Sequence, residues 1–174
     1  MVETTIYRKI LVYLGFFFSN LLAGASFVLL WIWEVILVGF TLVSGVLGIA
    51  LLLNLQLQPV IPPMPYWCAV LFGLSFLALS PALAVGSIYF GCYLHQLMRS
   101  FARYNHNTLA RAKGRAVLPS ISGHPQFSPE KRRRLRNIAL FSLAAFAIFF
   151  ILAMIVSIFS AQSLEFWHKW QWFN

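Results

Sequence analysis

One carboxylate, Glu34, lies inside the longest apolar run of the sequence, which extends from Ile10 to Leu53. Placing an ionisable side chain inside a membrane-spanning segment costs free energy, and such a residue often marks a path for protons or ions. A second interpretation places Glu34 in a hydrated turn, because Trp31 and Trp33 flank it and tryptophan favours the membrane–water interface. The sequence leaves both interpretations open. Asn20, in the same run, is a candidate for a hydrogen bond between helices.

The other residues that could do chemistry form no recognisable catalytic or metal-binding pattern. The chain contains no aspartate, so paired-acid magnesium sites are not expected. His95, His106 and His124 are too widely and irregularly spaced for a compact zinc motif. Cys68 and Cys92 would lie about 36 Å apart on one helix and cannot pair. We therefore expect no enzymatic activity, no metal and no cofactor.

Ten of the 13 lysine and arginine residues fall in one polar segment, from Arg99 to Arg136. Between hydrophobic spans, such a cluster orients the chain and contacts anionic lipid or a partner protein. It contains no nucleic-acid recognition module, so nucleic acid is not an expected partner. The candidate contact residues are Arg99, Arg103, Arg111, Lys113, Arg115, Lys131, Arg132, Arg133, Arg134 and Arg136.

The composition indicates an integral membrane protein. Of the 174 residues, 60% are hydrophobic and only 10% are charged, with a net charge of +9. A soluble domain carries roughly 25% charged residues. The predicted fold class is all-α: a polytopic membrane helical bundle of three to four hydrophobic helices with a basic amphipathic cytoplasmic segment. The chain forms a single membrane domain, residues 1–174.

The first apolar run, residues 10–53, is about twice as long as a helix needs to cross a hydrocarbon core of ~30 Å. We expect it to fold back once, as a helical hairpin or as a re-entrant helix plus one span. The favoured break is Trp31 to Glu34, and the alternative is Asn20 to Ser26. Two full spans would place the polar N-terminus, residues 1–9, outside, and the re-entrant arrangement would place it inside.

Four prolines and no charge make residues 54–65 an extended connector on the outer side of the membrane. Residues 66–98 form the next span, whose surplus length should emerge from the membrane. Pro81 should kink this span, with the freed carbonyl near Leu77 accepting a hydrogen bond from a hydroxyl such as that of Ser80.

Residues 99–137 form the basic cytoplasmic loop. The chain that leads from the end of the preceding span into this loop is amphipathic, a pattern that suits a membrane surface. One stripe holds Leu94, Met98, Phe101 and Asn105, and another holds His95, Arg99 and Arg103. Gly114 is a plausible helix stop. Ser128, Pro129 and Glu130 read as a helix N-terminus before the last span, residues 138–161. The Trp-rich tail, residues 162–174, should lie in the opposite interface.

Small residues four apart recur along the apolar segments, and this spacing lets helix backbones approach closely. They support a packed bundle and nothing more specific. The pairs are Gly15/Ser19, Ser44/Gly48, Ala82/Gly86, Ser87/Gly91 and Ala153/Ser157.

The layout resembles the membrane half of the HAAS-linked bacterial families, which are small membrane proteins of uncertain function often encoded beside PadR-type regulators. The similarity lies in an apolar N-terminal run, a long glycine-containing helix entering an arginine-rich stretch, and a basic cluster at 131–136 before one final span. It implies a bacterial inner-membrane protein with a signalling or accessory role. The 174 residues hold no counterpart of the soluble helical domain found in those proteins, and no functional residue carries over.

The expected location is the cell membrane, as a multi-pass protein of the bacterial cytoplasmic membrane with the basic loop in the cytoplasm. The expected function is that of a non-enzymatic accessory or regulatory subunit. Its partners would be membrane lipids, including anionic headgroups, and a membrane protein or further copies of itself. The alternative is a small oligomeric transporter or channel component that uses Glu34.

Overall fold

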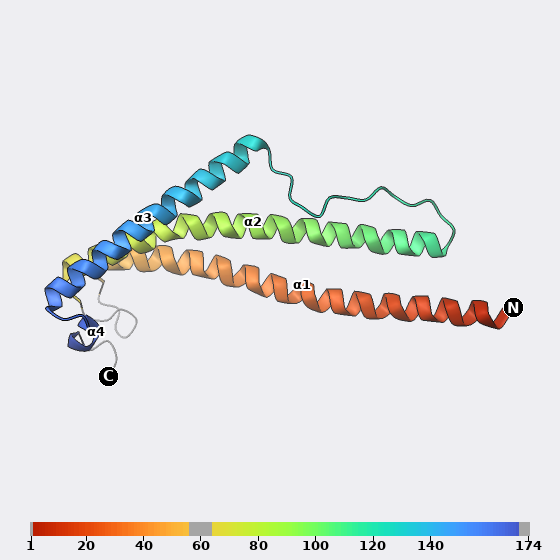
Figure 1. Cartoon of the computed structure of the whole chain (residues 1–174), viewed down its shortest axis with the longest axis horizontal. Coiled ribbons are helices and arrows are strands. Elements are labelled where there is room, and N and C mark those ends of the chain that lie inside the picture. The colour runs from red at the N-terminus through yellow and green to blue at the C-terminus, as the bar shows by residue number, and fades with distance from the viewer. Residues whose placement is uncertain (1, 56–63, 171–174) are drawn as a thin grey trace. The chain divides into compact units, whose positions relative to one another are not determined.

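The computed structural model describes residues 2–55 and 64–170, and these residues form helices and connections without a strand. The helices are α1 (Val2–Leu52), α2 (Tyr66–Ala112), α3 (Pro129–Ala161) and the short α4 (Phe166–Lys169) (Figure 1). The first three are long and apolar enough to cross a membrane. The predicted all-α class with three hydrophobic helices is confirmed. Most of the expected connector at 54–65 and the last four residues of the tail lie outside the described residues.

The predicted fold-back of the first apolar run is wrong, because α1 is one helix of 51 residues that passes through Trp31 and Glu34 without a break. Its length is about 77 Å, against a hydrocarbon core of ~30 Å. The prediction assumed that the whole apolar run at 10–53 lies within the hydrocarbon core. No proline interrupts the run, and isolated glycines such as Gly24 do not break a helix.

Helices α1 and α2 each end at a residue in the left-handed backbone conformation. At the end of α1, Asn54 adopts the left-handed conformation, and the Leu55 amide donates to the Ala50 carbonyl. Gly114 ends α2 in the same way, with the Arg115 amide donating to Ala110 at 2.8 Å. Both ends are Schellman motifs, so the predicted stop at Gly114 is confirmed.

The predicted start at Ser128 is also confirmed. Its hydroxyl caps α3 by accepting a hydrogen bond from the Lys131 amide, and Pro129 occupies the first turn, where its missing N–H costs nothing. The basic segment at 99–137 is therefore helical at both ends, and 113–128 alone connects α2 to α3.

The chain divides into two compact units. The first contains Met1–Val35 and Phe90–Pro125, and the second contains Ile36–Tyr89 and Gln126–Asn174. The long helices α1 and α2 contribute to both. Each unit is described separately below.

In the first unit, the part of α1 from 13 to 35 presents a regular seam to α2. The spacing of its less exposed residues alternates between four and three, which is the seven-residue repeat of a left-handed coiled coil. Phe27 in this seam contacts Phe101 of α2, with ring centroids 5.5 Å apart. The seam residues are Phe16, Asn20, Ala23, Phe27, Leu30 and Glu34.

The amphipathic stripe predicted on α2 therefore packs on α1. Leu94 is 1% exposed, Phe101 contacts Phe27, and Asn105 contacts Asn20. A membrane surface was the partner suggested by the sequence. Helix α1 supplies the apolar partner instead, because its own surplus length lies alongside this stripe.

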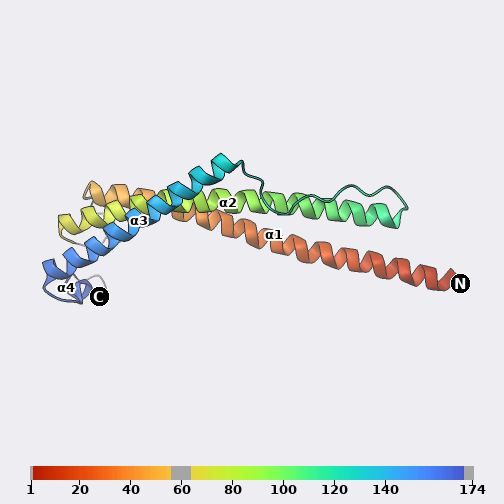
Figure 2. The same cartoon turned by 45° about the horizontal axis from the view of Figure 1, so that its top comes forward.

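The connection from α2 to α3 runs back along α2 in both views (Figures 1 and 2). Asn107 holds it through two hydrogen bonds to the backbone of Leu118, at 2.8 and 3.0 Å. Gln96 donates to the carbonyl of Ser122 at 2.6 Å. These contacts replace the regular hydrogen bonds that a turn-rich sequence cannot make for itself.

In the second unit, α1 and α2 approach closely through small residues. A Cβ built on Gly48 would lie 2.9 Å from the Gly73 carbonyl oxygen, and one built on Gly73 would lie 2.9 Å from the Gly48 carbonyl oxygen. Ser44 donates its hydroxyl to the Phe76 carbonyl at 2.9 Å. The predicted pair Ser44/Gly48 thus lies at a helix–helix contact, as close-packing membrane helices require.

The core of the second unit joins all three long helices. Leu51 of α1, Ala69 and Phe72 of α2, and Ala153 of α3 form a buried cluster. Phe72 also contacts Phe150, with ring centroids 6.1 Å apart. At the C-terminal end, Phe166 of α4 is 3% exposed, so the start of the aromatic tail packs on protein.

Pro81 lies inside α2 without ending the helix. The expected partner for the freed carbonyl is wrong: the Ser80 hydroxyl donates to the Thr41 carbonyl of α1, at 3.1 Å. The interhelical bond is favoured because α1 lies close enough at this level for a hydroxyl to reach its backbone.

Candidate functional site

Asn20 and Asn105 form a polar pair within the seam of the first unit. The Asn105 side-chain amide donates to Asn20 Oδ1, while Asn20 donates to the carbonyl of Phe16 in its own helix at 2.8 Å. The interhelical role predicted for Asn20 is therefore confirmed, with Asn105 as its partner. A buried asparagine in a coiled-coil seam fixes the register of the two helices, since slippage would separate the pair.

Glu34 occupies the next polar position of the same seam and does not lie in a turn. Its Oε1 would be 3.1 Å from a Cβ on Gly91, so the carboxylate packs directly over the glycine backbone of α2. The side chain is half-buried, and its Oε2 is closed off from solvent. Glycine at 91 is what allows a carboxylate to fit between the two helices at this point.

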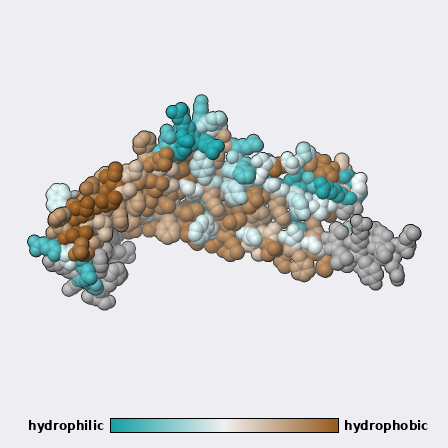
Figure 3. All heavy atoms as spheres, viewed as in Figure 1, coloured by the Kyte–Doolittle hydropathy of each residue, from teal (hydrophilic) through white to brown (hydrophobic). Residues whose placement is uncertain are grey.

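The ten basic candidate residues are divided equally between the two units. Arg99, Arg103 and Arg111 lie on α2, and Lys113 and Arg115 begin the connection, all in the first unit. The remaining five lie in the first two turns of α3, in the second unit, and are exposed. Hydrophilic side chains gather at the beginning of α3, and the rest of this helix is strongly hydrophobic (Figure 3).

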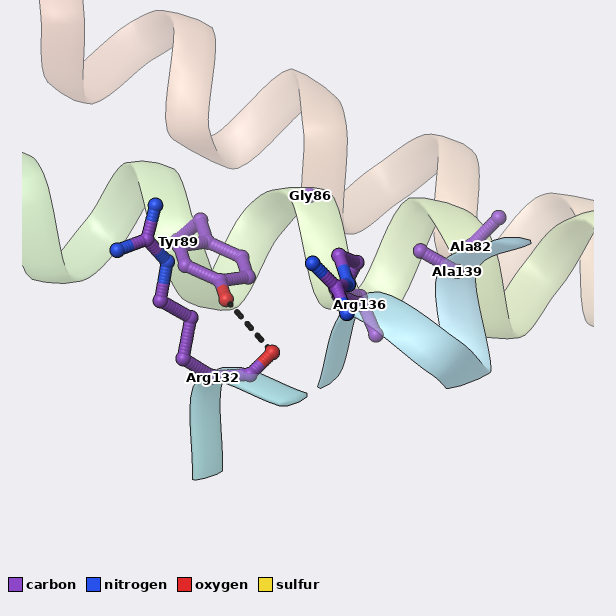
Figure 4. Close-up of a pocket in the computed structure, with 7 residues that line it drawn as sticks. Ala82, Gly86, Tyr89, Arg132, Arg136 and Ala139 are labelled. Atoms are coloured by element: carbon purple, nitrogen blue, oxygen red, sulfur yellow. Dashed lines mark hydrogen bonds between the residues drawn. The ribbon is translucent and has the colours of Figure 1, made fainter. Parts of the chain in front are cut away.

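Two of these arginines line a cavity between α2 and α3. The cavity has a volume of about 420 Å³, and Arg132 and Arg136 contribute to its wall from α3. The Tyr89 hydroxyl donates to the Arg132 carbonyl at 3.5 Å, a long and weak contact (Figure 4). Phe127 packs on the Tyr89 ring, with centroids 4.9 Å apart. The other lining residues are Ala82, Val85, Gly86 and Ala139.

Reasoning from sequence missed Tyr89 and Gly73. Tyr89 is one of several aromatic residues in α2, and no local signal distinguishes it from the others. Ala69 lies four positions before Gly73, but this pair was not among those that the small-residue spacing singled out. The pair Ala82/Gly86 was recognised, yet it lines the cavity and does not join two helices.

The histidines and cysteines give no sign of a reactive centre. Within the described part of the chain, no three His, Cys, Asp or Glu side chains come together to hold a metal ion. Cys68 is buried and Cys92 is exposed, and both are free thiols. The described residues thus offer polar contacts between helices and a cavity lined by two arginines.

These features define a class: a helical, multi-pass membrane protein whose described residues include three helices long and apolar enough to cross a membrane. Comparison with known protein families, with curated proteins and with solved structures finds no match for this chain. The resemblance to the HAAS-linked families stays a prediction. The function is therefore argued from the surfaces and contacts described above.

Proposed function

We propose that the chain is a non-enzymatic accessory or regulatory subunit of a membrane assembly. It packs on a membrane protein, or on further copies of itself, through the face of α1 that points away from α2. Its basic segment contacts anionic headgroups or a cytoplasmic partner. The observation that carries this proposal is the apolar, uncovered face of α1 in the first unit.

This outer face of α1 consists of large apolar side chains that lie between the seam positions. Each is more than half exposed, and Leu22 reaches 72%. Figure 3 shows hydrophobic side chains over α1 and more hydrophilic ones over the neighbouring part of α2. The outer face contains Tyr13, Leu14, Phe17, Phe18, Leu21, Leu22, Val28, Leu29, Trp31 and Ile32.

The charges on α2 argue against lipid tails as the only cover for this face. The contact between Asn20 and Asn105 places the early part of α1 beside Arg103 and Arg111. Insertion scales assign roughly 8 to 10 kcal/mol to three arginines, Arg99 included, at the centre of a bilayer. This part of the unit is therefore expected outside the hydrocarbon core. A large apolar face there marks a protein-interaction surface.

The arrangement of the first unit also supports a topology. Because Asn20 meets Asn105, the beginning of α1 lies at the same end of this unit as the basic part of α2. Arg8 and Lys9 then fall on the side of the five basic residues at 99–115, and the positive-inside rule assigns that side to the cytoplasm. Three spans place the connector at 54–65 and the C-terminus outside.

The interaction surface is tested by photocrosslinking in intact membranes. A benzophenone-bearing amino acid is placed at Leu22, on the outer face, or at Ala102, an exposed residue of α2. Illumination should give a protein adduct at position 22, either a dimer of the chain or one defined partner. Position 102 serves as the matched control and should give none.

Lipid adducts without protein adducts at position 22 would contradict the proposal, because lipid would then be the cover of the outer face. The topology is tested with single cysteines at Gly123 and Met64 in a background without Cys68 and Cys92. Labelling of position 123 from the cytoplasmic side alone, and of position 64 from outside alone, is the expected result.

The alternative function, a transporter or channel component, depends on Glu34. The carboxylate packs over Gly91 in a seam between two helices of one chain, and this placement suits a structural role better than a conduction path. Proteoliposomes that carry the Glu34→Gln variant provide the test. Ion flux that depends on the protein and is lost in this variant would favour the alternative.

A further inference from the structure

The cavity between α2 and α3 is formed by one stripe from each helix. Ala82, Val85, Gly86 and Tyr89 follow one another at three- and four-residue steps on α2. Arg132, Arg136 and Ala139 do the same on α3. Residues at such steps share one face of a helix, so two whole helix faces line the cavity.

The cavity has a polar end and an apolar end. The contact between Tyr89 and Arg132 defines the polar end, and Arg136 lies between this contact and the two alanines (Figure 4). Ala82 and Ala139 lie together away from these groups in the same view. One end of the cavity is thus marked by Tyr89 and Arg132, the opposite end is lined by alanine methyl groups, and Arg136 lies between the two ends.

The position of this cavity on α3 matches the boundary of a bilayer. The uncharged part of α3 begins at Ile138 and ends at Ala161, which gives about 36 Å of helix for a hydrocarbon core of ~30 Å. Arg136 lies two residues before it, and Arg132 lies one turn further out. The arginines therefore fall at headgroup depth, and Ala139 falls at the edge of the acyl chains.

The charge at the polar end meets no carboxylate among the residues that the structure describes. Among the described residues, neither Arg132 nor Arg136 forms a salt bridge with a carboxylate. Guanidinium groups bind phosphate through paired, charge-assisted hydrogen bonds. Small side chains keep the apolar end open, and a Cβ on Gly86 would meet no atom within 4 Å.

We propose that this cavity binds one anionic phospholipid. The phosphate lies between Arg132 and Arg136, with the Tyr89 hydroxyl beside it, and an acyl chain runs over Gly86 and Ala139. The inference deepens the proposed function, because it rests on the same membrane orientation and turns a general contact with anionic headgroups into a defined site.

The test is native mass spectrometry of the full chain released from mild detergent with added lipid. Phosphatidylglycerol is the anionic probe and phosphatidylcholine with identical acyl chains is the zwitterionic one. Inorganic phosphate and glycerol phosphate compete as headgroups without chains. The wild-type chain should retain one phosphatidylglycerol in preference to phosphatidylcholine, and the two soluble phosphates should not displace it.

Two variants of equal charge separate a site from general attraction. Arg132→Gln with Arg136→Gln should lower the retained phosphatidylglycerol by about tenfold, since both phosphate contacts are removed. Arg133→Gln with Arg134→Gln removes two charges from the same helix turns but none from the cavity. This control should retain the lipid within about twofold of the wild type.

A third variant, Gly86→Leu, fills the apolar end without changing the charge. It should release the lipid while it leaves the helix intact, because the side chain enters open space and leucine favours helix more than glycine. Equal losses in both double arginine variants, or displacement by inorganic phosphate, would overturn the lipid site. The crosslinking at position 22 does not involve this cavity, so either proposal can fail without the other.

Discussion

The two units join α1 to α2 by different means. In the second unit, the backbones nearly touch at Gly48 and Gly73, and two serine hydroxyls donate to carbonyls of the opposite helix. In the first unit, the contact is made by large side chains such as Phe27 and Phe101, and by polar side chains that meet between the helices.

This difference follows from the solvent that each unit is expected to meet. Lipid tails provide no hydrophobic force between helices, so spanning helices gain from close backbone approach and interhelical hydrogen bonds. A coiled coil outside the hydrocarbon gains from apolar burial, and a polar pair in its seam fixes the register. The change in packing along α1 therefore supports the proposed depth of each unit.

The largest effect is expected for Gly48→Ala. The added Cβ would lie 2.7 Å from Leu77 Cγ and 2.9 Å from both the Gly73 carbonyl oxygen and the Leu77 amide nitrogen. Relief requires a backbone shift, so the free energy of unfolding should fall by about 2 to 3 kcal/mol. Thermal or denaturant unfolding in detergent measures this change.

Gly39→Ala is the matched control, because a Cβ at this position meets nothing within 4 Å and the alanine favours helix. It should leave the stability unchanged or raise it by up to about 1 kcal/mol. Equal behaviour of the two variants would mean that α1 and α2 do not pack through Gly48.

A smaller effect is expected for Asn105→Ala in the first unit. The change removes the donor to Asn20 Oδ1, but it also removes Asn105 Oδ1, which is buried without a hydrogen bond within the described residues. The two contributions oppose each other, and the net loss should be about 1 kcal/mol. Amide exchange in 13–35 and 90–112 should accelerate about fivefold.

Exchange in the second unit should not change in this variant, since its seam contains neither asparagine. Thr108→Ala serves as the control, because the Thr108 hydroxyl donates only to the Tyr104 carbonyl of its own helix. Uniform acceleration across both units would show that they unfold together and that the polar pair has no local role.

The smallest effect is expected for Ser80→Ala. Loss of the hydrogen bond to the Thr41 carbonyl should cost about 0.6 kcal/mol, the average measured for such bonds between membrane helices. Ser26→Ala removes a hydroxyl that bonds only to Leu22 in the same helix, and it should have no measurable effect on unfolding. A loss above about 2 kcal/mol would mean that Ser80 also stabilises the interruption at Pro81.

Local signals in the sequence predicted the start of α3 and the end of α2 correctly. Ser128 and Pro129 start α3, and Gly114 ends α2, because capping depends on a few neighbouring residues. The close contact at Ser44 and Gly48 was also accessible, since small residues four apart have a direct steric meaning.

The continuity of α1 and its seam were not predicted. Length alone cannot tell whether surplus apolar sequence folds back or packs on another helix. The seven-residue repeat is hidden because the seam residue Phe27 is as apolar as its exposed neighbour Val28, so no hydrophobic contrast marks it. The partners Asn105, Gly91 and Tyr89 are distant in sequence and needed the fold to bring them into place.

The seven-residue seam limits how the length of α1 can vary. One residue inserted between Asn20 and Glu34 would rotate every position on one side of it by about 100°, because an α-helix has 3.6 residues per turn. Outward-facing residues would then point at α2. An insertion of seven residues would turn the seam positions back toward α2. It would still move Asn20 and Glu34 about 10 Å further apart. Helix α1 is therefore expected to tolerate substitutions on its outer face far better than any insertion or deletion.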